Sequence, residues 1–443
     1  MPLSINSIYN FHAGLINELL LRDLPNMQRR LAEASANDRI HSSKITSPSV
    51  DFLVPHDRLT GAMIVLMKHA EALSKAGCRV RLLGHGHEPP PWAPRSIPWT
   101  PVHPRNDWAH GADADVVVAA VIEQVPQAVI RHGLRVLLFE QGNAWLFEQG
   151  EGSPMLKAIF AMPAMTATVS PYAADLIRRN YGRDPFECYN GYEDEIFFAD
   201  ASRKRPRSVV IIGDPLVEMK RIPLALATAE ELRRHGYQAV LVSPRPLSCS
   251  IPVVSGADRA TIGEILRASE FLIHTSRYEA FGLPVLEALA CGTSVVGTDS
   301  FGIRLFAKDG HGFWKANADP YDLADKVIRA SEMPLQERIE EAVKAAAPFK
   351  WSRIVKRFVL PMYQRAASRR VSSIPNIEPR HLHVRIPYSI PMALRADSWG
   401  PGVHPNAEYL LDPELEDDVS LTIGDIGAIM GKGVSTPSLR RLR

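Results

Sequence analysis

The sequence has few of the features that mark disulfide-rich or membrane-spanning proteins. Its 443 residues hold only four cysteines, which lie far apart, without the close pairs that zinc sites and disulfide frameworks use. No stretch reaches the roughly 18 to 20 apolar residues that span a bilayer. Residues 1–21 lack both a basic leader and an apolar core with a cleavage site, so they do not resemble a secretory signal. We therefore expect a cytoplasmic protein, with peripheral contact at the inner face of a membrane as an open alternative.

An excess of charge of one sign is also missing. The chain has 51 Lys and Arg against 49 Asp and Glu, a formal net charge of +2. This balance supplies no large positive field, so we expect no nucleic-acid partner. The chain is 46% hydrophobic and 23% charged, which is typical of soluble globular proteins, and its length predicts two or three domains.

Two stretches alternate short apolar runs with amphipathic segments, which predicts βαβ units and parallel sheets. In residues 50–187 the expected strands are 50–54, 79–83, 116–121, 136–139 and 166–169, with a helix over 63–76. In residues 208–350 they are 208–212, 239–243, 271–274 and 294–297. The prediction is therefore two doubly wound α/β domains with a ligand cleft between them at the carboxyl ends of the strands.

The remaining segments differ in character. Residues 1–49 carry leucine-rich helical patches and are expected to form an N-terminal helical extension. The polar and basic residues 188–207 are interpreted as a linker, with anionic lipid as the rival role for its Arg203–Arg207 run. Residues 351–366 have one apolar helical face, which Pro361 should kink or end. Residues 367–443 are expected to be a proline-rich tail, partly disordered or wrapped on the surface.

The segment from His274 to Thr293 carries the most specific pattern. A strand should end near Thr275, and a helix should begin at Leu283 with Pro284 in its first turn. Free amides at Gly282 and Leu283, together with the helix dipole, suit a phosphate or diphosphate. Glu279 in the loop and Glu287 in the helix could accept hydrogen bonds from sugar hydroxyls, although a pair of glutamates alone would more often be structural.

The string Phe-Gly-Leu-Pro-x-Leu-Glu-Ala-x-Ala-Cys-Gly in residues 281–292 resembles the retaining, nucleotide-sugar-dependent glycosyltransferases of family 4. Glu279 and Glu287 occupy the two places of that family's Glu, seven residues, Glu motif. The resemblance covers about residues 50–365 and implies the GT-B fold, with 50–187 as acceptor domain, 208–350 as nucleotide-sugar domain and 351–366 as a returning helix. It further implies hexosyl transfer with retention, without metal or resident cofactor.

Site residues follow from the same resemblance. Glu279 and Lys220 are expected to be catalytic, with Lys220 offsetting charge on the leaving group. Asp214 stands where the family has a second cation, so either Arg221 or another cation replaces it, or the donor is bound more weakly or in a different arrangement. Residues expected to bind the donor are Glu287, Phe281, Gly282, Leu283, Arg221, Gly61 and Gln141.

Weaker patterns bear on the subgroup and on metals. The run from Phe139 to Phe147, which includes Gln141, resembles a stretch of bacterial rhamnosyltransferases that build surface polysaccharide. Asp113-Ala114-Asp115 matches a metal-binding signature of another glycosyltransferase fold, but acids commonly precede a strand. His85-Gly86-His87 more simply forms a surface loop.

Three functions remain open. The first is transfer of a sugar from a nucleotide-diphosphate sugar to a carbohydrate, lipid-linked or small-molecule acceptor, in glycan or polysaccharide biosynthesis. The second is a phosphorylase or sugar-phosphate synthase on the same fold. The third is a non-catalytic nucleotide-sugar-binding scaffold subunit. The sequence names neither the donor sugar and base, nor the acceptor and linkage, nor the oligomeric state.

Overall fold

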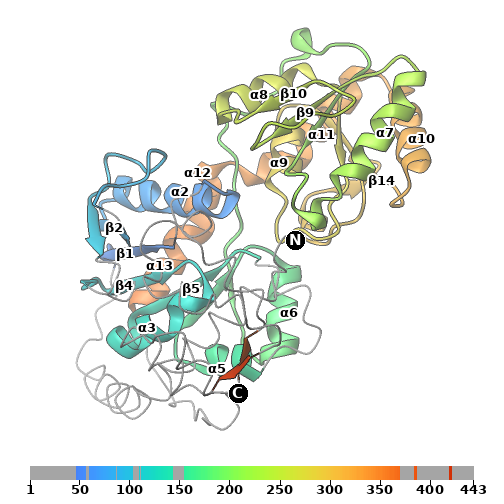
Figure 1. The fold of residues 1–443 in the computed structure, drawn as a ribbon. Coiled ribbons are helices and arrows are strands. Elements are labelled where there is room, and N and C mark those ends of the chain that lie inside the picture. The colour runs from blue at the N-terminus through green and yellow to red at the C-terminus, as the bar shows by residue number, and fades with distance from the viewer. Residues whose placement is uncertain are drawn as a thin grey trace. The chain divides into compact units, whose positions relative to one another are not determined.

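A computed structural model describes residues 46–55, 59–85, 87–102, 109, 111–142, 154–369, 384–386 and 419–421 (Figure 1). The chain divides into two compact units. The first runs to Thr168, takes in Ala174–Phe186 and resumes at Val359; the second consists of Val169–Ala173 and Glu187–Phe358.

The first unit is built on a seven-stranded sheet of order β3-β2-β1-β4-β5-β6-β7, in which β1 to β6 pair in parallel. Every residue of β1, β4 and β5 is buried, as expected where helices cover both faces of a parallel sheet. The strands are β1 (Val50–Val54), β2 (Val80–His85), β3 (Trp99–Val102), β4 (Val116–Ala119), β5 (Val136–Glu140), β6 (Met165–Thr168) and β7 (Phe186–Glu187). The helices are α2 (Gly61–Lys75), α3 (Val125–His132), α5 (Pro154–Ala161), α6 (Pro171–Tyr181) and α13 (Leu360–Ala367).

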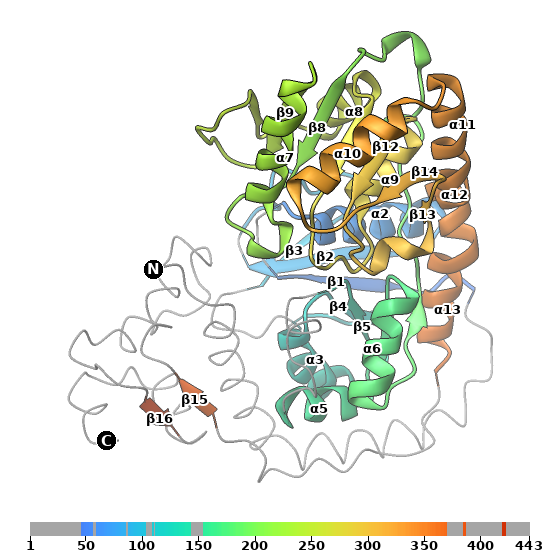
Figure 2. The ribbon, with the colours of Figure 1, turned by 90° about the vertical axis from the view of Figure 1, so that its right-hand side faces the viewer.

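The second unit is an all-parallel seven-stranded sheet of order β10-β9-β8-β11-β12-β14-β13. Helices α7 and α10 cover one face, and α8, α9 and α11 cover the other (Figure 2). The strands are β8 (Ser208–Ile212), β9 (Gln238–Ser243), β10 (Val253–Ser255), β11 (Phe271–His274), β12 (Ser294–Gly297), β13 (Lys308–Asp309) and β14 (Gly312–Lys315). The helices are α7 (Ile222–Arg234), α8 (Arg259–Ala268), α9 (Leu283–Ala290), α10 (Pro320–Ser331) and α11 (Leu335–Ala346).

Two doubly wound parallel sheets were the predicted fold class, and this prediction is confirmed. The expected strands 208–212, 271–274 and 294–297 have the observed bounds. The short strands β3, β7, β10, β13 and β14 were not predicted. They lie toward the outer edges of the two sheets, where the apolar runs are brief.

Residues 188–207, interpreted as a linker, are part of the second compact unit. Cys188, Tyr192 and Phe197 are buried. Lys204, which belongs to the basic run Arg203–Arg207, is buried as well. The Lys204 ammonium donates to the Ser269 carbonyl at 2.6 Å and to the Thr293 hydroxyl at 2.7 Å. Because its donors have acceptors inside the second unit, this charge can be buried there, which its sequence context does not reveal.

Pro361 does not end the C-terminal helix. The chain forms α12 (Trp351–Ile354), widens into a π-helical turn at Val355–Val359 and continues as α13 past the proline. The wider turn accommodates a residue that lacks an amide hydrogen and carries a bulky ring, so the helical path continues.

Several predictions fall wholly or largely outside the described residues. Of the N-terminal extension only 46–49 are described, and of the tail only 367–369 and two short strands, β15 (Val384–Ile386) and β16 (Val419–Leu421), which pair in antiparallel fashion. Among the described residues, no helix combines the length and the apolar character that crossing a membrane requires.

Helices α2 and α13 meet on the first sheet through His69 and Tyr363, both fully buried. His69 Nδ1 lies 3.2 Å from the Tyr363 hydroxyl oxygen, and its ring stacks on Phe139 with 4.8 Å between centroids. Burial lowers the pKa of His69 to about 3, so the folded protein holds this imidazole neutral.

We predict that His69 makes the first unit acid-sensitive. The unfolded chain takes up this proton near pH 6.5 but the folded chain only near 3, so the free energy of unfolding falls as pH drops through that window, by at most about 1.4 kcal/mol per pH unit. His69→Phe keeps the stacking and removes the titration. Urea unfolding followed by circular dichroism at pH 7.5, 6 and 5 should show a shallower pH dependence in the variant; parallel curves would contradict the assignment.

Candidate functional site

The predicted site residues of the second unit lie at the carboxyl edge of its sheet. Strand β8 lies between β9 and β11. The loop after β8 leads to α7 and the loop after β11 leads to α9, and these two helices cover opposite faces of the sheet. Such a reversal of strand order leaves a crevice at the carboxyl ends, where ligands bind in open α/β sheets.

Lys220 and Glu279 come together in this crevice. Lys220 ends a short 3₁₀ turn after β8, and its ammonium donates to Glu279 Oε1 at 2.5 Å. The Glu279 backbone is fixed by the loop after β12: its amide donates to the Ser300 carbonyl, and its carbonyl accepts from the Gly302 amide, at 2.9 and 3.0 Å. A Cβ on Gly302 would lie 2.3 Å from the Glu279 carbonyl oxygen, so this approach requires glycine. The two predicted catalytic residues therefore form one ion pair.

The pKa of Glu279 lies below its ordinary value. Burial alone would raise it, but the Lys220 charge, together with His274 and hydrogen bonds from Lys220 and Ser276, outweighs burial. The carboxyl group is consequently ionised at neutral pH, with 12% of the side chain exposed.

The start of α9 presents the expected backbone geometry. Gly282 has φ +93°, and a Cβ there would lie 2.4 Å from Ile303 Cγ2, so only glycine fits. Pro284 occupies the first turn, and no described residue accepts a hydrogen bond from the Gly282 or Leu283 amide. These two amides, at the positive end of α9, can therefore bind an anion.

Phe281, which is expected to bind the donor, has a buried side chain. It is 3% exposed and packs against Phe306 and Phe349, with ring centroids 5.3 and 6.1 Å away. Its ring is part of the hydrophobic core beneath the loop. Because Phe281 directly precedes Gly282, this packing helps to hold the turn in place.

Glu287 belongs to a buried ionic cluster that the sequence reasoning missed. Arg259, the first residue of α8, donates to Glu287 Oε1 at 2.8 Å and also pairs with Glu193. Burial raises the pKa of Glu287, opposed by Arg259. Glu193 and Arg259 carry no motif spacing that relates them to Glu287, so only the packing of α8 against α9 reveals the cluster.

Arg221 is half-buried, and its guanidinium donates hydrogen bonds within the second unit. Its Nε donates to the Thr275 carbonyl at 2.7 Å, and its Nη2 donates to the Ser276 carbonyl and the Thr298 hydroxyl. It thus ties the loop after β8 to the ends of β11 and β12. The expectation that Arg221 replaces the missing cation at Asp214 stays a prediction.

Asp214 is itself paired. Its Oδ2 accepts from Arg245 Nη2 at 2.8 Å, and its Oδ1 accepts from the Leu216 amide at 3.0 Å. Arg245 lies in the loop after β9, the neighbour of β8. Arg245 has no motif around it in the sequence, and its partner is 31 residues away.

In the first unit, the structure brings Gly61 and Gln141 close together. Gly61 begins α2, whose N-cap Thr60 accepts from the Met63 amide. Gln141 Nε2, just after β5, donates to the carbonyl of Ala62 at 3.1 Å. Gln141 therefore holds the glycine loop, a role that the sequence did not show.

The acidic pair Asp113 and Asp115 has structural partners. Asp113 accepts from Arg81 at 2.6 Å, and Asp115 accepts from the Ser49 hydroxyl at 2.7 Å, which agrees with their interpretation as strand-start residues. In the described part of the chain, no three His, Cys, Asp or Glu side chains are grouped so as to hold a metal ion. Gly86 of the His85–His87 run lies outside the described residues.

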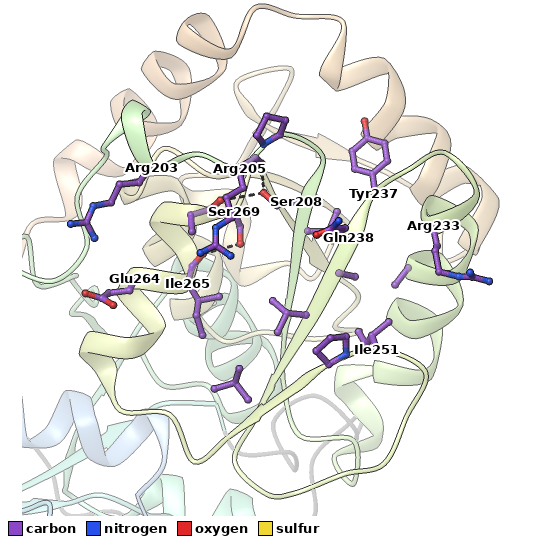
Figure 3. A pocket seen from close by; sticks show the side chains of 18 of the residues that line it. Arg203, Arg205, Ser208, Arg233, Tyr237, Gln238, Ile251, Glu264, Ile265 and Ser269 are labelled. Carbon is purple, nitrogen blue, oxygen red and sulfur yellow. Dashed lines mark hydrogen bonds between the residues drawn. The ribbon is translucent and has the colours of Figure 1, made fainter.

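A separate pocket of about 900 Å³ lies in the second unit, lined by residues at the starts of β8 and β9, including Ser208 and Gln238 (Figure 3). Arg203 and Arg233 extend from two of its sides. None of the predicted site residues lines it. Neither Lys220 nor Glu279 is among its lining residues, so it is distinct from the Lys220–Glu279 crevice.

Comparison with known proteins agrees with this architecture. Sucrose-phosphate synthase from Thermosynechococcus elongatus has a similar structure, with a TM-score of 0.59 and 15% identity over 70% of this chain and 96% of that one. HepE of Anabaena, solved with UDP and glucose, gives a TM-score of 0.54 and 15% identity over 70% and 97% of the two chains. The fold is therefore that of the GT-B glycosyltransferases.

One family model matches a stretch within the second unit. Residues 246–346 match the family described as glycosyl transferases group 1. D-inositol 3-phosphate glycosyltransferase 2 of Catenulispora acidiphila is 36% identical over 161 residues, which are 36% of this chain and 35% of that protein. The chain thus matches about a third of the length of this curated relative.

We predict that Arg221 stabilises the second unit. Arg221→Met keeps the side-chain stem but removes three hydrogen bonds from a charged donor, each contributing about 1.5–3 kcal/mol at most. The urea midpoint of unfolding should fall clearly. Arg233→Met, which removes an exposed arginine from α7, is the matched control and should leave the midpoint unchanged. Equal urea midpoints for the two variants would show that the hydrogen bonds of Arg221 do not stabilise the second unit.

Proposed function

We propose that this protein is a retaining glycosyltransferase that moves a hexosyl group from a nucleotide-diphosphate sugar to an acceptor hydroxyl. The observation that carries the proposal is the Lys220–Glu279 ion pair, set beside the Gly282 and Leu283 amides at the carboxyl edge of the sheet. The group 1 match over residues 246–346 supports it, since Glu279, Gly282 and Glu287 fall within that range.

Each group has a defined task in this proposal. The bond between the anomeric carbon and the diphosphate oxygen breaks, and a bond to the acceptor oxygen forms on the same face of the sugar. The acceptor proton passes to the leaving phosphate oxygen. Lys220 and the two amides stabilise the negative charge that develops on the diphosphate, a type of stabilisation that acts strongly in a site with little water.

The carboxylates bind the donor. Glu279, held ionised by Lys220, accepts hydrogen bonds from the donor sugar, and Glu287 accepts them from the ribose hydroxyls. Gly61 and Gln141 keep the donor-binding role that the sequence predicts for them. The reaction in this proposal uses no metal, because cationic side chains and amides neutralise the diphosphate.

The broader setting is part of the same proposal. We place the reaction in the cytoplasm, in glycan or polysaccharide biosynthesis, with a carbohydrate, lipid-linked or small-molecule acceptor. HepE was solved with UDP and glucose, which makes UDP-glucose the first donor to test. Transfer to inorganic phosphate instead of a hydroxyl would identify a phosphorylase.

The test combines donor screening with product stereochemistry. The full chain is incubated with UDP-, ADP-, GDP- and TDP-sugars and a panel of sugar and inositol phosphate acceptors, with and without EDTA. Proton NMR of the product should show the anomeric configuration of the donor, at a rate that EDTA leaves unchanged. Inversion, or loss of activity with EDTA, would contradict the mechanism; failure of every donor to react would favour a scaffold role.

We predict that Lys220→Ala lowers kcat by about 10²–10³, the effect of removing one group that stabilises transition-state charge. Lys344→Ala is the control, because Lys344 is an exposed lysine on α11 with a carboxylate partner of its own. Steady-state kinetics with saturating donor measures the difference. An unchanged kcat in Lys220→Ala would remove this residue from the mechanism.

A second variant pair tests Glu287. Glu287→Ala should weaken nucleoside diphosphate binding about tenfold or more, because a hydrogen bond to a charged group contributes about 1.5–3 kcal/mol. Glu193→Ala removes the other carboxylate of Arg259 and leaves Glu287 in place, so it should change binding far less. Isothermal titration with UDP and ADP compares them. Equal losses would mean that the cluster is structural only.

A further inference from the structure

The loop after β9 carries a positively charged side chain, Arg245, at the carboxyl edge of the sheet, next to the loop that follows β8. Strands β9, β8 and β11 are neighbours in that order, so the loops that follow them lie side by side at the carboxyl edge. Two ion pairs connect these loops: Arg245 with Asp214, and Lys220 with Glu279. Each pair joins the loop after β8 to one neighbour.

The Arg245–Asp214 pair is strongly asymmetric in exposure. The Asp214 side chain is 15% exposed, whereas that of Arg245 is 55% exposed. The carboxylate is held by the Leu216 amide, and the Arg245 amide donates to the Ser243 hydroxyl at 3.3 Å. The acid therefore serves as the inner anchor, and the group that faces solvent is the guanidinium.

We propose that Arg245 is a donor-binding residue that contacts the diphosphate of the nucleotide, and that Asp214 is the residue that positions it. This inference rests on the proposed function. A guanidinium has more N–H donors than one carboxylate oxygen uses, so it can bind a phosphate while it remains paired. In this arrangement Asp214 can lie next to the diphosphate, because the positive charge of Arg245 neutralises its carboxylate.

The positioning role of Asp214 can be separated from its charge. If the carboxylate acted on the ligand only through its charge, Asp214→Ala would strengthen diphosphate binding, because a nearby negative charge is removed. If it anchors Arg245, the same variant weakens binding, because the guanidinium loses its fixed orientation. We expect a loss of about threefold, less than for removal of Arg245 itself.

The experiment measures binding to the full chain by isothermal titration, with UDP, ADP and GDP and with each free nucleoside. Arg245→Met should weaken nucleoside diphosphate binding by about tenfold and leave nucleoside binding unchanged, because the contact is to phosphate. Arg245→Lys, which keeps the positive charge at this position, should recover part of the loss. Arg233→Met is the control for removal of an arginine, and urea unfolding verifies that each variant is folded.

The outcomes separate this inference from the function on which it rests. Weakened binding in both Arg245→Met and Lys220→Ala supports it. Weakened binding in Lys220→Ala with Arg245→Met within twofold of the unmodified protein overturns the role of Arg245 and leaves the proposed function standing. Absence of nucleoside diphosphate binding in the unmodified protein, together with absence of sugar transfer, overturns both.

Discussion

The ion pair between Lys220 and Glu279 is the interaction on which the arrangement of the crevice depends. It joins loops that follow two neighbouring strands, β8 and β11, and it fixes the charge state of the carboxylate. The loop of Glu279 is held in turn by Ser300 and Gly302 after β12. Three consecutive carboxyl ends of one parallel sheet thus converge on a single carboxylate, a result that only parallel strands with their loops at one edge can give.

The two motif glutamates are separated by seven residues but experience opposite electrostatic surroundings. Glu279 faces Lys220, which lowers its pKa, whereas burial raises the pKa of Glu287 even though Arg259 opposes it. Arg259 also serves Glu193, so its charge is shared between two carboxylates. The two glutamates therefore differ in role: Glu279 is an ionised group at the crevice, whereas Glu287 is part of a buried ionic cluster.

Sequence reasoning succeeded where the signal is local. Strands 208–212, 271–274 and 294–297 contain short apolar runs, and the turn before α9 is marked by a glycine with positive φ, Gly282, followed by a proline in the first helical turn. It failed where the deciding partner is distant. The three acceptors of Lys204, the guanidinium beside Asp214 and the Arg259 cluster all depend on residues about 30 to 90 positions away, and the π-helical turn before Pro361 has no signature in composition.

The pairing of Lys220 with Glu279 also sets a condition on ligand binding. On the proposed function, the same ammonium must bind an arriving diphosphate, and part of its charge is then no longer available to Glu279. The largest contribution that lowers the pKa of this carboxyl group is thereby reduced, while burial, which raises it, stays or increases. Sugar hydroxyls that donate hydrogen bonds to Glu279 would replace the stabilisation of its ionised form that Lys220 no longer provides. Diphosphate and sugar would therefore bind most favourably together, since each compensates for the charge that the other disturbs.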